Sequence, residues 1–163
     1  MFKRLFCHAG IATLVGAGAA LVALPSVAQA QSGTVVNGSV SALGKTCSWT
    51  NGMATGAPPT TTTIEANTIN TPGGNLSCSS GVTASLDNNP SVSFNDSAGT
   101  ATANQITASV KYDGISCEYS ATNVLLDRSG STRDYSGSAS ASKVSGSFLC
   151  PSSVSLSSTL DFQ

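Results

Sequence analysis

The sequence predicts an all-β fold, an antiparallel β-sandwich or Greek-key barrel that is held by disulfides and has almost no helix after the signal peptide. Three observations support this prediction: apolar and polar residues alternate with a period of two, turn-forming residues recur about every 8–12 residues, and no stretch has the helical period. The clearest example is residues 104–126, where two alternating runs flank Asp113-Gly114. Because Asp-Gly favours the positive φ angles of a type I′ turn, we expect a β-hairpin here, with Cys117 on its inward face.

Residues 1–30 are predicted to be a secretory signal peptide and not part of the fold. A basic start precedes an apolar run over residues 11–24, and an A-Q-A cleavage motif ends at Ala30. The run is too rich in glycine and alanine for a membrane span, which needs about 20 strongly apolar residues. We therefore expect one β-rich domain over residues 31–163 without a membrane span. It would be secreted to the medium or the cell surface, with the periplasm as the alternative.

The charge and histidine content of this domain exclude several classes of function. Its five lysines and arginines and eight aspartates and glutamates give a net charge of −3 without a basic patch, so neither nucleic acid nor anionic lipid is an expected partner. The one histidine, His8, lies in the signal peptide, which excludes Ser-His-Asp catalysis, Cys-His catalysis and histidine-ligated metals. No cofactor is expected. The acids offer no preferred catalytic pair, so we expect no enzyme, and a deep pocket lined by two of them would reverse that interpretation.

The four cysteines of the domain predict disulfides, because an even number in an exported chain is typical of them. We prefer Cys47–Cys78 with Cys117–Cys150, which close neighbouring segments, and the alternative is Cys78–Cys117 with Cys47–Cys150. Each loop of this size would add about 3–4 kcal/mol to stability. A tetrathiolate zinc site is the competing interpretation, and the absence of a C-x-x-C pair argues against it.

The first half of the domain predicts short strands separated by turns. Residues 31–43 predict an edge strand, and residues 45–50 predict a second strand with Cys47 and Trp49 on one face. The stretch 54–63, rich in proline and threonine, predicts a loop. Further strands are expected over residues 62–69, around Cys78, and over residues 82–86 and 91–95.

Two oxygen-rich turns bracket the strand over residues 91–95. Asp87, Asn88 and Asn89 precede it, and Asn95 and Asp96 follow it. Such oxygens could together bind a calcium ion. Asparagine and aspartate are also ordinary turn formers, and no known calcium-loop spacing is present, so we expect structural turns.

After the hairpin, residues 127–134 predict a polar loop, and residues 144–150 and 154–162 predict the last strands. Between them, residues 135–142 alternate small side chains, so a bulky partner or a close backbone is expected opposite them. The core looks thin, because aromatic residues are few and serine and threonine make up about a third of the domain. Strands of this composition, with few charges, leave side-by-side self-association open.

Two classes of function compete. The first is a non-enzymatic accessory or structural protein that contacts a hydrophobic substrate, the cell-surface matrix or its own copies. The second is a binding module or inhibitor that recognises a carbohydrate or a protein through the loops 54–63 and 127–134. Exposed aromatic and arginine side chains commonly make such contacts. The candidate residues for this binding surface are Trp49, Tyr135, Arg128 and Arg133.

The second half of the chain resembles small secreted β-rich proteins of bacteria that end in a C-x-Y-x-A-T-N segment followed by a K-V-S-G…C-P segment. Here the first segment begins at Cys117, and the second runs from Lys143 to Pro151. The general plan of signal, four cysteines and Ser/Thr/Gly-rich strands is also similar to that of the secreted activators of alkane oxidation, the Pra-type proteins. The resemblance covers residues 99–162. It implies an accessory protein that helps cells to use hydrophobic substrates, and it implies no catalytic residues.

Overall fold

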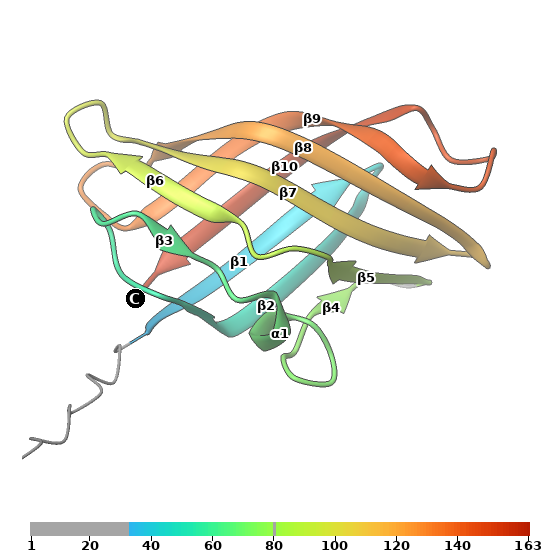
Figure 1. The fold of residues 1–163 in the computed structure, drawn as a ribbon, viewed down its shortest axis with the longest axis horizontal. Coiled ribbons are helices and arrows are strands. Elements are labelled where there is room, and N and C mark those ends of the chain that lie inside the picture. The colour runs from blue at the N-terminus through green and yellow to red at the C-terminus, as the bar shows by residue number, and fades with distance from the viewer. Residues whose placement is uncertain (1–32, 80) are drawn as a thin grey trace, which may run out of the picture.

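A computed structural model describes residues 33–79 and 81–163, which form one strongly curled antiparallel sheet (Figure 1). The strands in chain order are β1 (Thr34–Ala42), β2 (Lys45–Ala54), β3 (Thr62–Thr63), β4 (Ser77–Cys78), β5 (Val82–Leu86), β6 (Ser91–Asn95), β7 (Thr100–Tyr112), β8 (Ile115–Arg128), β9 (Asp134–Gly146) and β10 (Ser153–Phe162). The one helix of these residues is the single turn α1 (Ala66–Ile69). The all-β, disulfide-bonded fold is thus confirmed, and the predicted signal peptide over residues 1–30 lies outside the described residues.

The sheet wraps around a single interior because its two ends meet. β6 to β10 form a meander, and β1 lies between β10 and β2. β7 pairs with β6 along its first part and with β5 along its last part. β2 then reaches the segment that follows β3: Ala54 pairs with Ile64 in an isolated bridge, and the Thr55 N–H donates to the carbonyl oxygen of Thr63 at 2.9 Å.

The hairpin predicted around Asp113-Gly114 is confirmed. β7 and β8 pair from Tyr112 and Ile115 onward, and the φ angles of Asp113 and Gly114 are 48° and 79°. These two positive values are the ones that a type I′ turn requires. The turn therefore fixes the register of the two longest neighbouring strands.

Residues 62–69 are not one strand as predicted, because the chain leaves β3 and turns into α1. Side chains of this turn take over the hydrogen bonds that a strand backbone would have made. The Met53 N–H donates to Thr68 Oγ1 at 2.8 Å. The Asn70 side chain accepts from the Leu86 N–H and donates to the Leu86 carbonyl oxygen, each at 2.8 Å. The helical turn can thus sit against β2 and β5 without leaving their backbone groups unpaired.

The interior is packed tightly at one end. The rings of Phe94, Tyr135 and Phe162 contact one another there, with centroid distances from 5.3 to 6.1 Å. Next to them Gly137 lets β8 approach closely, since a Cβ at Gly137 would lie 2.2 Å from the carbonyl oxygen of Leu125. The close backbone that the small residues of 135–142 predict is found at this position. We call these three rings the aromatic cluster. They come from the end of β6, the start of β9 and the end of β10, and these strand ends lie on the left in Figure 1.

Candidate functional site

A cavity of about 500 Å³ fills the middle of the curled sheet. Its volume lies within the range of roughly 300–1,000 Å³ that is typical of pockets for small molecules. The side chains that line it are apolar or aromatic with four exceptions, which are Ser39, Lys45, Ser85 and Ser158. A cavity with such an apolar lining accepts apolar molecules.

Small residues on three strands of the sheet help to create this space. Ala84 of β5 and Ala108 of β7 line it from one side, and Ala139 and Ala141 of β9 line it from another. A methyl group at each of these places leaves the centre of the sheet unfilled, because no larger side chain reaches across from the opposite wall. The composition predicted a core with few large side chains. In the structure this shortage takes the form of one cavity.

The cavity reaches solvent at the end of the sheet opposite the aromatic cluster. Leu43 from the β1–β2 turn, Tyr112 from the β7–β8 hairpin and Leu149 from the β9–β10 loop all line it and are all exposed. These three connections lie together on the right in Figure 1. We call this end of the cavity the mouth.

Trp49 lines the cavity and carries a buried polar group. Its Nε1 is buried and has no hydrogen-bond partner among the described residues. The ring is held against β1 and β2 by glycines, because a Cβ at Gly38 would lie 2.3 Å from Trp49 Cζ2, and one at Gly52 would lie 3.1 Å from Cδ1. A buried donor without an acceptor costs about 1–3 kcal/mol. A ligand with an acceptor oxygen would remove that cost.

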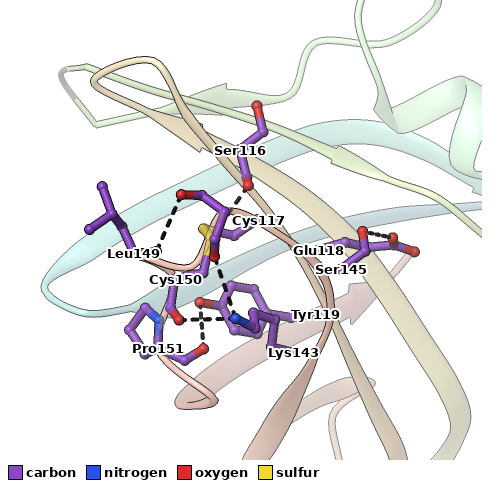
Figure 2. The surroundings of a disulfide bond; sticks show 10 residues. Ser116, Cys117, Glu118, Tyr119, Lys143, Ser145, Leu149, Cys150 and Pro151 are labelled. Atoms are coloured by element: carbon purple, nitrogen blue, oxygen red, sulfur yellow. Dashed lines mark hydrogen bonds between the residues drawn. A yellow bond between two sulfur atoms is a disulfide. The ribbon is translucent and has the colours of Figure 1, made fainter.

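The Cys117–Cys150 disulfide anchors the β9–β10 loop beside the mouth (Figure 2). Lys143 Nζ donates to the carbonyl oxygens of Ser147 and Cys150, each at 3.4 Å. Beneath the loop, Tyr119 donates its hydroxyl to the Pro151 carbonyl oxygen at 3.2 Å. Burial raises the pKa of the Tyr119 phenol, so this hydroxyl keeps its proton and remains a donor.

The second disulfide joins Cys47 of β2 to Cys78 of β4. Together with Cys117–Cys150 it gives the pairing that the sequence analysis preferred. Two disulfides fit a chain that works in an oxidising compartment. They engage all four cysteines that could have formed the alternative zinc site.

The predicted binding surface of Trp49, Tyr135, Arg128 and Arg133 is not assembled. Tyr135 is only 2% exposed, because it shares the inward face of β9 with Ala139 and Ala141 and packs in the aromatic cluster. Trp49 lines the cavity. The two arginines lie at the far end from the mouth, where Arg128 Nη1 pairs with Asp96 Oδ1 at 2.9 Å and Arg133 is exposed.

The oxygen-rich turns are occupied with structural hydrogen bonds. Asp87 accepts from the hydroxyls of Ser85 and Ser109, at 3.0 and 2.7 Å. Asn88 bonds the backbone of β7, and Asp96 pairs with Arg128. Within residues 33–79 and 81–163, no three His, Cys, Asp or Glu side chains are grouped so that they could hold a metal ion. No aspartate or glutamate of this part lines the 500 Å³ cavity either.

Comparisons of the chain with protein-family models, with curated proteins and with solved structures find no match. The resemblance to the Pra-type proteins therefore stays a prediction. No helix in the described part of the chain is long and apolar enough to cross a membrane.

Proposed function

We propose that this chain is an exported, non-enzymatic accessory protein that binds a small apolar molecule inside its curled sheet. The observation that carries the proposal is the 500 Å³ cavity with its apolar lining. Moving apolar surface out of water contributes about 25 cal/mol per Å², so a ligand that fills the cavity would gain most of its affinity from burial. This role agrees with the contact to a hydrophobic substrate that the sequence analysis expected.

The walls of the cavity support binding without a large rearrangement. They come from paired strands that a hairpin turn and two disulfides hold in register. A preformed site loses less conformational entropy when it binds than a flexible one does. Recognition of a carbohydrate or a protein through the loops has less support, because the two aromatic side chains that would serve it, Trp49 and Tyr135, face the interior.

Filling the cavity should weaken binding. We expect the mature chain, residues 31–163, to bind N-phenyl-1-naphthylamine, a neutral apolar dye, with a rise in fluorescence. Ala139→Leu should weaken this binding at least tenfold, because the lost burial of a few carbons costs about 1.4 kcal/mol or more. Ser140→Leu is the matched control, since Ser140 is the outward-facing neighbour on the same strand. It should bind the dye like the natural chain.

Ala108→Leu, which fills the cavity from β7, provides a second test if Ala139→Leu does not fold, as judged by circular dichroism. The proposal is wrong if the natural chain leaves the dye fluorescence unchanged. It is also wrong if a folded, cavity-filled variant binds as well as the natural chain.

Trp49 should select ligands that carry an acceptor oxygen. We expect a straight-chain methyl ketone to displace the dye better than the alkane of equal length, because the ketone oxygen can accept from Trp49 Nε1. Trp49→Phe keeps an aromatic ring and removes the donor. It should therefore reduce this preference about fivefold, which corresponds to a hydrogen bond of about 1 kcal/mol. Competition titrations of both ligands against both proteins measure the effect. A preference that Trp49→Phe leaves unchanged would show that the indole N–H does not contact the ligand.

A further inference from the structure

We propose that the mouth end of the molecule docks on a lipid bilayer, so that an apolar ligand passes between the acyl chains and the cavity without crossing water. The docking rests on exposed side chains at the mouth, three of which, Leu43, Tyr112 and Leu149, also line the cavity. The ligand transfer rests on the proposed function. The two parts are therefore tested separately below.

Exposed apolar side chains gather at the mouth. Six large hydrophobic side chains of the described chain are exposed, and all but Leu125 belong to the β1–β2 turn, the end of β7, the end of β9 or the β9–β10 loop. We call these five the apolar rim: Leu43, Tyr112, Val144, Phe148 and Leu149. Single exposed hydrophobic residues are ordinary, whereas a group of them on one surface marks a place of contact.

The most exposed members sit on an anchored loop. Phe148 is 89% exposed and Leu149 is 60% exposed. The Ser147 N–H donates to the Ser116 carbonyl oxygen at 3.1 Å, the Cys150 N–H donates to the Ser147 carbonyl oxygen at 3.0 Å, and the disulfide holds Cys150 to β8. In Figure 2 the Leu149 side chain points away from these anchors. A loop held in this way presents its apolar side chains to a partner without an additional ordering cost.

The lysines are confined to the mouth end. Lys45, Lys111 and Lys143 are the three lysines of the described chain, and all lie there. The acids at this end are Asp113, Glu118 and Asp87, whose carboxylate accepts from Ser109 opposite Glu118. This end is therefore neutral, while the remaining five acids and two arginines give the rest of the described chain a charge of −3. Lysines beside apolar side chains suit the boundary between phosphate headgroups and acyl chains.

Tyr112 strengthens this assignment. Its ring lies under Lys45, with Nζ 5.1 Å from the ring centroid. A tyrosine with a neighbouring cation is typical of side chains at the level of lipid headgroups, where one end of the ring is apolar and the other is wet. Tyr112 also lines the cavity, so the docked surface would be continuous with the mouth.

The test is co-sedimentation of the mature chain with phosphatidylcholine vesicles that contain a minority of phosphatidylglycerol. We expect the natural chain to sediment with the vesicles and the double variant Phe148→Ser, Leu149→Ser to lose about tenfold or more of its partition coefficient. Both side chains are exposed, so this variant should fold. The matched control is Leu125→Ser, which removes the one exposed large hydrophobic side chain outside the apolar rim and should leave binding unchanged.

Each further outcome decides between the two proposals. Failure of the natural chain to bind vesicles while it still binds N-phenyl-1-naphthylamine would overturn the docking and leave the cavity function standing. Vesicle binding without dye binding would support the docking and overturn the proposed function. If the natural chain ignores vesicles and forms dimers that the double variant disrupts, the apolar rim is an interface between copies and the inference is wrong.

Discussion

Replacing Phe162 by alanine is expected to lower the free energy of unfolding by about 3–5 kcal/mol. Phe162 is 2% exposed, and its ring packs against those of Phe94 and Tyr135 at 5.4 and 6.1 Å between centroids. The substitution removes the apolar burial and both ring contacts, and it leaves a void that the surrounding strands cannot fill. Urea unfolding followed by circular dichroism measures the loss.

Ile106→Ala is the informative comparison, because Ile106 lies on the cavity wall. Its side chain already lacks partner atoms on the cavity side, so its removal should cost only about 2 kcal/mol, the lower end for isoleucine. An equal or larger loss for Ile106→Ala would mean that the middle of the sheet is packed as tightly as the aromatic cluster. That result would count against the cavity itself.

The hairpin could be predicted from the sequence because its signal is local, whereas the even number of cysteines indicated disulfides and left two pairings open. Asp113-Gly114 specifies its turn without reference to the rest of the chain. The helical turn α1 could not be predicted in this way. It is stabilised by side chains of Thr68 and Asn70 that bond strands far along the chain, and nothing in the sequence alone identifies those partners.

The cavity was only partly visible in the sequence. The alternation of Gly137, Ala139 and Ala141 showed that one face of this strand is small. Whether a large side chain or a void lies opposite depends on which strands face each other, and that is a property of the whole sheet. The same alternation includes Tyr135, so it could have placed that residue on the inward face and removed it from the predicted binding surface.

The packing of the interior therefore changes from one end of the curled sheet to the other. The aromatic cluster closes one end and supplies tight packing, alanines hollow the middle, and the apolar rim surrounds the mouth. The charges differ between the same two ends, with the lysines at the mouth and most acids elsewhere. The tightly packed end of the molecule therefore contributes most to stability, and the end with the apolar rim is suited to contact with an apolar phase.

Removing either disulfide should lower the free energy of unfolding by a similar amount, while only one of them should affect docking. The two bonds span 31 and 33 residues, so replacement of either pair by alanine should cost about 3–4 kcal/mol by the same loop-closure argument. Cys117–Cys150 also anchors the loop that carries Phe148 and Leu149. We therefore expect Cys117→Ala, Cys150→Ala to weaken vesicle binding, and Cys47→Ala, Cys78→Ala to leave it close to that of the natural chain.

Urea unfolding and vesicle co-sedimentation of both variants, at a temperature at which both are folded, measure the two effects separately. The Cys47–Cys78 variant is the matched control, because it reproduces the loss of stability without releasing the loop at the mouth. If both variants lose vesicle binding to the same extent, docking depends on overall stability and not on the anchored loop. If neither loses it, Phe148 and Leu149 reach the bilayer without the disulfide, and the anchoring step of the inference is wrong.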